Sequence, residues 1–156
     1  MAPKKQTDLK LLKKVMLDKV KVFMAICKAY ALRVFVTETL RTAERQAYLW
    51  SVGRTISITS KKVTWTKVSM HQSGLAVDRA FVGTMYKGDR DAFRHFAKHC
   101  GLTKIIQEQC HTQDNCYTVE EVMARNSRLW ESSEWDVSYR KLLHKINDEF
   151  RKLWYK

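Results

Sequence analysis

The chain has 156 residues, of which 45% are hydrophobic, and its 29 lysines and arginines outnumber 16 acidic residues to give a formal net charge of +13. This length and apolar content exclude a disordered chain and fit one domain, residues 1–156, that is long enough to bury a core. The charge predicts attraction to a polyanion, a class that includes cell-wall polymers, anionic membranes and nucleic acid.

Helical and extended patterns alternate through the first half of the chain. Apolar residues at helical spacing predict a helix over residues 8–30, and strict alternation predicts a strand over residues 32–40. Residues 42–52 are typical of a second helix, with Thr42 as its N-cap. Residues 55–70 are rich in Ser, Thr and Lys, and we expect a loop beside the substrate with some strand in it.

The second half repeats this alternation of strand and helix. A core strand is predicted over residues 75–82, a helix over 89–100 and a further strand over 103–111. Two helices, 118–131 and 136–155, complete the chain. The fold class is therefore α+β.

The last predicted helix, at about residues 136–155, is both amphipathic and basic. Its apolar face comprises Leu142, Leu143, Ile146, Phe150, Leu153 and Trp154. This face could bind an anionic membrane or lipopolysaccharide, with the cations at the headgroups. Packing against the N-terminal helix is the favoured use, because most amphipathic helices of compact domains serve the core.

The N-terminal region does not look like an export signal, because lysines interrupt every apolar segment. No apolar run approaches the length that spans a bilayer. We therefore expect a protein that is made in the cytoplasm and whose four cysteines are reduced thiols. A bridge between Cys110 and Cys116 is the alternative.

The strongest functional pattern lies in residues 69–78, which read Ser-Met-His-Gln-Ser-Gly-Leu-Ala-Val-Asp. A glycine between His71 and Asp78 permits a tight turn, and the alternation that follows keeps Asp78 off the core face, so that His71 folds back near it. Downstream, Glu108 precedes His111 by three residues. Two imidazoles and one carboxylate are suitable zinc ligands, and the glutamate then remains as a proton acceptor. In the simpler alternative, His71 caps a loop and Asp78 is a surface carboxylate.

A second set of candidate zinc ligands follows. His95 and His99 are four residues apart and share one helix face, with Cys100, Cys110 and Cys116 nearby. The spacing matches no compact zinc-finger pattern. We therefore expect His95 and His99 to lie on the exposed side of their helix.

The pattern Ser-x-His-x-x-Gly-x-Ala-x-Asp over residues 69–78 resembles the signature of the D-alanyl-D-alanine carboxypeptidase-like zinc peptidases. That family includes phage endolysins that cut the L-alanyl-D-glutamate bond of peptidoglycan. Residues 38–46, Glu-Thr-Leu-Arg-Thr-Ala-Glu-Arg-Gln, resemble its arginine-containing block, and residues 53–55 its Gly-Arg-Thr segment. With residues 86–89, Tyr-Lys-Gly-Asp, the similarity extends over residues 30–113.

The resemblance implies a role for each matched residue. His71, Asp78 and His111 would bind one zinc ion per chain. Glu108 would be the general base, and Arg41 would polarise the carbonyl of the bond that is cut. The family also implies that the sheet is small and antiparallel, carries the zinc site and is flanked by the N- and C-terminal helices.

The match is less complete before His111, where Cys110 stands in the place of a frequent proline. Ser69 matches a residue close to the bound substrate. The implied activity is hydrolysis of an amide bond in the wall stem peptide, with L-alanyl-D-glutamate as the first candidate. A D-alanyl-D-alanine carboxypeptidase shares these motifs. A non-catalytic module for cell wall or nucleic acid on a degenerate peptidase fold is the alternative from another class.

The expected partner is therefore peptidoglycan. No specific nucleic acid is expected, because the chain has no aromatic and basic motif of a known nucleic-acid binder. We expect a monomer that acts on the cell wall or in the periplasm after its release.

Overall fold

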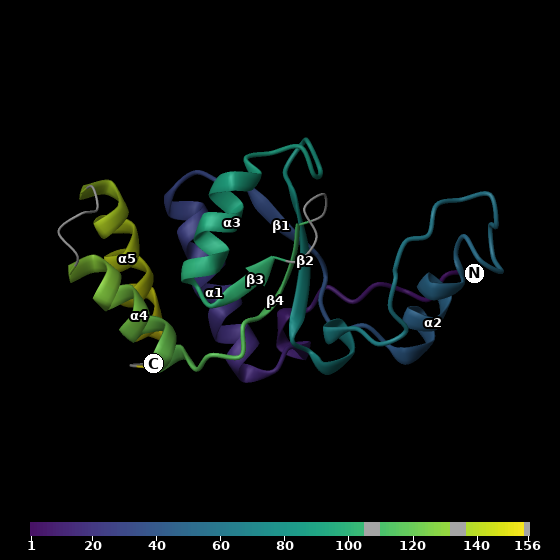
Figure 1. Cartoon of the computed structure of the whole chain (residues 1–156), viewed down its shortest axis with the longest axis horizontal. Helices are drawn as coiled ribbons and strands as arrows, with labels where there is room; N and C mark the ends of the chain where they lie inside the picture. The colour runs from purple at the N-terminus through teal and green to yellow at the C-terminus, as the bar shows by residue number, and fades with distance from the viewer. Residues whose placement is uncertain (105–109, 132–136, 155–156) are drawn as a thin grey trace.

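The computed structural model describes residues 1–104, 110–131 and 137–154 (Figure 1). In chain order, with η marking a 3-10 helix, the elements are η1 (Leu9–Leu11), α1 (Lys14–Ala29), β1 (Val34–Glu38), α2 (Ala43–Ser51), η2 (Met70–Ser73), β2 (Ala76–Phe81), α3 (Arg90–His99), β3 (Leu102–Lys104), β4 (Cys110–Asp114), α4 (Val119–Glu131) and α5 (Val137–Trp154). The predicted α+β class is confirmed, since the described parts hold five α-helices and one four-stranded antiparallel sheet.

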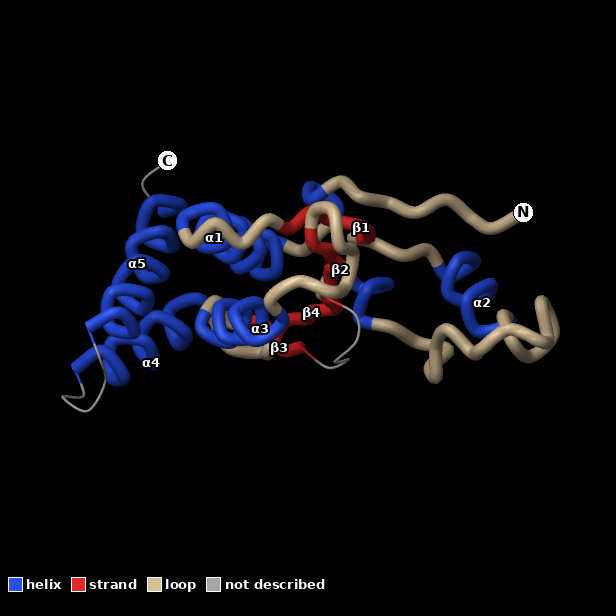
Figure 2. Tube along the Cα trace, turned by 90° about the horizontal axis from the view of Figure 1, so that it is seen from above, coloured by secondary structure: helices blue, strands red, loops and turns tan. Residues whose placement is uncertain are grey.

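The strands lie in the order β1-β2-β4-β3, so β2 and β4 form the centre of the sheet. Figures 1 and 2 show α1 and α3 on one side of the sheet, α4 and α5 beyond them, and α2 at the opposite end of the molecule. Antiparallel sheets commonly cover one face and leave the other to solvent or ligand. The face that is turned away from α1 and α3 is therefore the one available for chemistry.

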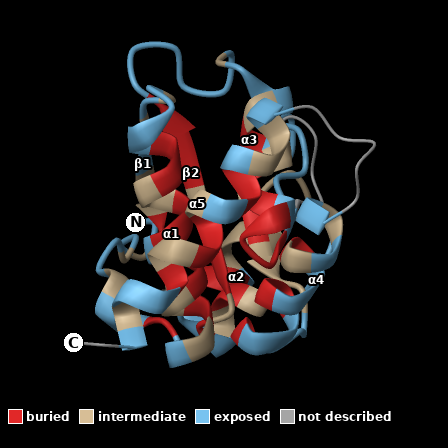
Figure 3. Ribbon diagram, turned by 90° about the vertical axis from the view of Figure 1, so that its left-hand side faces the viewer, coloured by how far each residue is buried: buried red, intermediate tan, exposed pale blue. Residues whose placement is uncertain are grey.

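Alternation along β2 separates the core from this second face. Val77 and Phe81 belong to the core, and Arg79 between them is fully buried, with its guanidinium carbon 4.3 Å from the centre of the Phe23 ring of α1. Phe93 of α3 completes the cluster, with its ring centre 4.9 Å from that of Phe23. Figure 3 shows the buried residues concentrated in this central region. Asp78 lies on the other face, as the sequence predicts.

The predicted N-terminal helix is interrupted. The backbone at Leu12 and Lys13 is extended, and η1 therefore ends before α1 begins. The cause is a tertiary contact, because the backbone N–H of Lys13 donates to the carbonyl oxygen of Gly74 at 3.0 Å. By contrast, the predicted cap of the second helix is confirmed, since Thr42 Oγ1 accepts from the backbone N–H of Arg45 at 3.1 Å.

Two strand predictions are wrong. Residues 103–111 were expected to form one strand, but β3 and β4 are separate and pair antiparallel, with Leu102 opposite Asp114. The stretch contains no glycine, proline or asparagine to indicate a reversal. Residues 55–69 contain no strand; local hydrogen bonds, such as Ser60 N–H to Ser57 O at 2.8 Å, close turns there instead.

The prediction for His99 is also wrong, because this side chain is 4% exposed. Its Nε2 lies 2.9 Å from the hydroxyl of Tyr139, and Asn126 Nδ2 donates to its carbonyl oxygen at 2.9 Å. The helices α4 and α5 therefore cover a face of α3 that was expected to meet solvent. His95 is half-buried.

The amphipathic face of α5 serves the core, which confirms the favoured use of this helix. Leu142, Leu143, Ile146 and Phe150 are buried, and α5 packs on α1 and α4. Binding of an anionic membrane or lipopolysaccharide through this helix stays a prediction. Within the described ranges, no helix is both long enough and apolar enough to cross a bilayer.

No disulfide joins any of the four cysteines in the structure, so the alternative bridge between Cys110 and Cys116 is not formed.

Candidate metal centre

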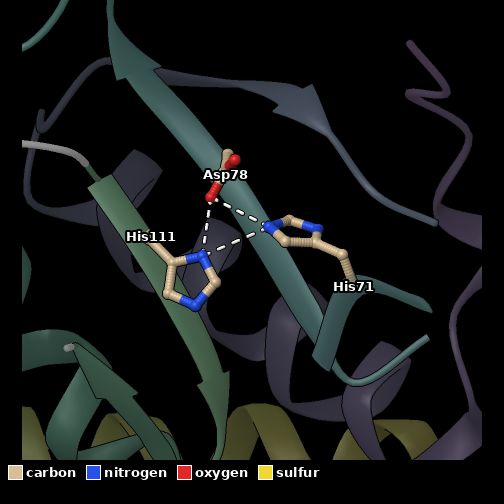
Figure 4. A group of neighbouring side chains, drawn as sticks. All are labelled: His71, Asp78 and His111. Carbon is tan, nitrogen blue, oxygen red and sulfur yellow. Dashed lines mark hydrogen bonds and ion pairs between the residues drawn. The ribbon is translucent and has the colours of Figure 1, made fainter. Parts of the chain in front are cut away.

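Three side chains that are distant in sequence meet on the open face of the sheet (Figure 4). Asp78 Oδ1 lies 2.8 Å from His111 Nδ1 and 3.1 Å from His71 Nε2, and these two nitrogens are 3.2 Å apart. We call these residues the ligand triangle. It is the one group of three or more metal-binding side chains at ligand distance in the described parts of the chain. The alternative His and Cys cluster does not assemble there.

Strand register and a tight turn build the ligand triangle. Asp78 of β2 stands directly opposite His111 of β4 in the antiparallel pair. His71 belongs to η2, which Ser69 caps at its N-terminus and which ends at Gly74 in the left-handed conformation, with φ of 69°. A Cβ atom at Gly74 would lie 3.1 Å from the carbonyl oxygen of Leu11, so the short turn that returns His71 to the strand favours glycine.

Hydrogen bonds fix the orientation of both imidazoles. His71 Nδ1 lies 2.6 Å from the carbonyl oxygen of Thr39, which can only accept, so Nδ1 carries the proton and Nε2 presents a lone pair. His111 Nε2 lies 3.3 Å from Gln113 Oε1, which can accept a hydrogen bond from Nε2 and so leave Nδ1 available as a ligand. Such partners hold metal-binding histidines in one tautomer. Neither Thr39 nor Gln113 was predicted, because a backbone carbonyl and a neighbour on the strand leave no mark in the sequence pattern.

The ligand triangle also suits zinc in its dimensions. Tetrahedral zinc with bonds of about 2.0–2.1 Å keeps its ligand atoms about 3.3 Å apart. The three separations between ligand atoms in the structure, 2.8 to 3.2 Å, are slightly shorter than this distance. Two imidazole nitrogens and one carboxylate oxygen match the ligand set of catalytic sites, which keep a fourth position open.

Arg41 lies beside the ligand triangle and contacts it at Asp78. Its Nη2 donates to Glu38 Oε2 at 2.6 Å and lies 3.4 Å from Asp78 Oδ2, while Nη1 donates to Gln46 Oε1 at 2.8 Å. Glu38 is buried opposite Asp78 in the pairing of β1 with β2, and it also accepts from Arg45 Nε. Burial opposes ionisation of Glu38, yet the hydrogen bonds and charges of Arg41 and Arg45 lower its pKa.

The sequence pattern alone predicts no role for Glu38. Its spacing of three residues before Arg41 was the available sign, since both fall in the block that resembles the family. The backbone N–H of Arg41 also donates to the carbonyl oxygen of His71 at 3.0 Å. Arg41 is therefore fixed relative to the ligand triangle through both its side chain and its backbone.

The ligand triangle opens into a cavity of about 340 Å³. Its lining residues are Lys5, Thr37, Glu38, Arg41, Arg45, Leu49, Val63, Thr64, Thr66, Val68, Ser69, Met70, His71, Asp78, Tyr86, His111 and Gln113. Ser69 is in this lining, as predicted, and its Oγ accepts from the backbone N–H of His71 at 3.3 Å. Tyr86, from the segment 86–89 that resembles the family, also lines the cavity, where burial and the charge of Asp78 raise its pKa.

Glu108, the predicted general base, lies outside the described residues, and its assignment stays a prediction.

Comparison with known proteins finds no matching family model and no matching curated protein. The solved structures with similarity to this chain include the following two. The vancomycin-resistance D,D-dipeptidase VanXYg, in complex with a D-Ala-D-Ala phosphinate analogue, matches with a TM-score of 0.52 and 21% identity over 74% of this chain and 55% of that chain. The Serratia marcescens L-Ala-D-Glu endopeptidase ChiX matches with a TM-score of 0.47 and 21% identity over 68% of this chain and 82% of that chain. The chain thus spans about half the length of VanXYg, and at this identity the similarity shows a shared fold alone.

Proposed function

We propose that residues 1–156 form a zinc-dependent peptidase domain that hydrolyses an amide bond in the stem peptide of peptidoglycan. The bond between L-alanine and D-glutamate, which phage endolysins of the resembled family cut, is the first candidate. The observation that carries the proposal is the ligand triangle, in which His71 Nε2 and His111 Nδ1 both face the carboxylate of Asp78 while their other ring nitrogens meet oxygen acceptors. Zinc held there would act as a Lewis acid and lower the pKa of a bound water to about 7.

The charge of the cavity suits this substrate. Lys5, Arg41 and Arg45 contribute three cations to its lining, against the carboxylates of Glu38 and Asp78. Stem peptides carry free carboxylates, including that of D-glutamate, which these cations would attract. The remaining lining supplies hydroxyl and amide groups that can orient a peptide backbone.

Hydrolysis joins the oxygen of water to the carbonyl carbon, breaks the C–N bond and transfers a proton to the departing amine. Arg41 has five N–H donors, and contacts with Glu38, Asp78 and Gln46 engage three of them. Arg41 can therefore offer a donor to the carbonyl oxygen as negative charge develops, a contribution that is typically about 2.7–4 kcal/mol. Glu108 is the proposed carrier of the proton.

The test is the release of new amino groups from purified peptidoglycan, measured together with bound metal. We expect one zinc per chain and cleavage that stops with a chelator. His71→Ala should lose metal and cleavage, whereas Glu108→Ala should keep the metal and lose cleavage. The exposed Glu44, in the first turn of α2, provides the matched control Glu44→Ala, which should keep both. Cleavage that is unaffected by the chelator would contradict the proposal.

A second candidate bond is the terminal D-Ala-D-Ala amide. The observation that favours it is the similarity in fold to VanXYg, which is described as a D,D-dipeptidase. Mass spectrometry of the products separates the two, because endopeptidase action exposes a new amino group on D-glutamate and D,D-cleavage releases free D-alanine. Absence of both metal and cleavage would leave the basic binding module as the better account.

A further inference from the structure

The loop between α2 and η2 exposes large apolar side chains. Trp65 is 78% exposed, Val68 77% and Ile58 70%. Folded proteins rarely expose a tryptophan to this extent, and neighbouring exposed apolar residues mark binding surfaces. Figure 1 shows this loop and α2 together at one end of the molecule, opposite α4 and α5.

Cations lie against the two tryptophans of this region. The guanidinium carbon of Arg54 is 3.6 Å from the ring centre of Trp50 and 5.8 Å from that of Trp65. Lys62 Nζ is 5.2 Å from the Trp65 ring, and Lys67 Nζ is 5.4 Å from the Trp50 ring. We call these five residues the Trp–Lys platform. No acidic residue occurs between positions 44 and 78 of the sequence, so no carboxylate of this loop offsets its positive charge.

Hydrogen bonds hold the loop that carries the platform in one conformation. Arg54 Nη1 donates to the carbonyl oxygen of Trp50 at 2.5 Å, and its Nη2 donates to that of Thr64 at 3.1 Å. Gln46 Nε2 donates to the carbonyl oxygen of Thr66 at 2.7 Å, while its Oε1 accepts from Arg41. The buried side chain of Gln46 thus links the loop to Arg41, which contacts the ligand triangle. A surface that is fixed before binding loses less conformational entropy on binding.

The same loop also forms one wall of the cavity. Val63, Thr64, Thr66 and Val68 line it, and the intervening Trp65 is exposed. The platform and this wall of the cavity therefore belong to the same loop.

We propose that the Trp–Lys platform binds the anionic polymer of the cell wall, the glycan strand with its carboxylate-bearing peptides, and so positions a stem peptide in the cavity. Sugar rings have an apolar C–H face that packs on an exposed indole, while the lysines pair with carboxylates. The choice of polymer rests on the proposed function. Single-stranded nucleic acid would use the same stacking and charge, but the continuity with the peptidase-like cavity favours the wall polymer.

The experiment measures binding without turnover. Chelator-treated full-length protein is sedimented with purified peptidoglycan sacculi across a range of concentrations, and a labelled single-stranded DNA oligonucleotide is titrated in parallel. The test variant is Trp65→Ala/Lys62→Ser/Lys67→Ser. The control is Trp154→Ala/Lys10→Ser/Lys141→Ser, which removes one exposed tryptophan and two exposed lysines elsewhere. Thermal melts verify that both are folded, and Lys62→Ser/Lys67→Ser replaces the test variant if the triple change unfolds.

We expect the test variant to bind sacculi about tenfold or more weakly than the wild type, since Trp is among the residues most enriched in binding hot spots and the lysines supply attraction to carboxylates. The control should bind as the wild type does. Three outcomes would each overturn the proposal. The test variant and the wild type could bind sacculi equally, the wild type could fail to bind sacculi, or the platform could be needed for binding DNA but not sacculi. Platform-dependent binding of sacculi would support it even if amide hydrolysis were absent, so its failure is distinguishable from failure of the proposed function.

Discussion

Replacement of Glu38 by glutamine tests the arrangement behind the ligand triangle. Glu38 is 3% exposed, and its carboxylate joins the guanidinium groups of Arg41 and Arg45. Glutamine has nearly the same shape but no charge, so the change removes the anion that two buried cations share. It should also leave Arg41 free to move towards Asp78, the other carboxylate within 4 Å of its Nη2.

Removal of one partner from a buried ion pair typically costs about 3–5 kcal/mol. Arg41 and Arg45 keep other acceptors, Gln46 Oε1 and the carbonyl oxygen of Pro3, both within 2.9 Å. We therefore expect the lower end of that range, a loss of about 3 kcal/mol in the free energy of unfolding. A tighter contact between Arg41 and Asp78 should weaken metal binding about 10–100-fold, as is typical when a partner of a metal ligand is altered.

Urea denaturation at pH 7 measures the first effect, and competition for zinc against a chelator measures the second. Glu44→Gln, an exposed change in the first turn of α2, is the matched control and should alter neither. A loss of stability below about 0.5 kcal/mol, the usual range of surface substitutions, would refute the role of Glu38 as the shared anion. Lost stability with unchanged zinc affinity would refute the competition of Arg41 for Asp78.

Three further predictions concern pH, backbone conformation and metal. Burial, reinforced by nearby positive charges, lowers the pKa of His99 to about 4 from its usual value of 6.5, so the unfolded state binds the extra proton between these values. The free energy of unfolding should be undiminished above pH 6.5 and fall by about 3 kcal/mol as the pH drops to 4. Urea titrations should show that His99→Gln removes this loss and that the exposed His144→Gln keeps it; equal slopes would contradict the reasoning. Gly74→Ala should lower the urea midpoint by an amount that corresponds to a loss of about 1–3 kcal/mol in the free energy of unfolding. Gly83→Ala should lower it less, because φ is also positive at Gly83 but no heavy atom lies within 4 Å of a Cβ placed there. Zinc at a hundred times its Kd should stabilise the wild type by about 2.7 kcal/mol and leave Asp78→Ala unaffected, whereas stabilisation of both in melting curves would place the metal elsewhere.

Local patterns predicted the features that depend on local physics. The cap at Thr42 and the side of β2 on which Asp78 lies follow from hydrogen-bonding groups and alternation that the sequence displays directly. Residues 118–131 and 136–155 match α4 and α5 within two residues at each end, because each presents a long apolar stripe.

What the sequence did not predict depends on tertiary contacts. The burial of His99 requires α4 and α5 to cover α3, and no spacing within α3 shows that they do. The reversal between β3 and β4 has no turn residue to indicate it. The role of Glu38 depends on its position opposite Asp78, which only strand pairing establishes. The three ligands could be named from their motif, but the acceptors that orient the histidines could not.

The register of β2 against β4 gives metal binding a further meaning. A slip of one residue would turn the side chains of β4 over, because successive residues point to opposite faces. Asp78 would then meet Cys110 or Thr112, both of which are buried among core residues in the correct pairing. Only the native alignment assembles three ligands, so an ion that binds them favours that alignment over every slipped one. Metal binding would therefore stabilise the correctly paired sheet relative to slipped ones. Zinc affinity would then report whether β2 and β4 had paired in the native register.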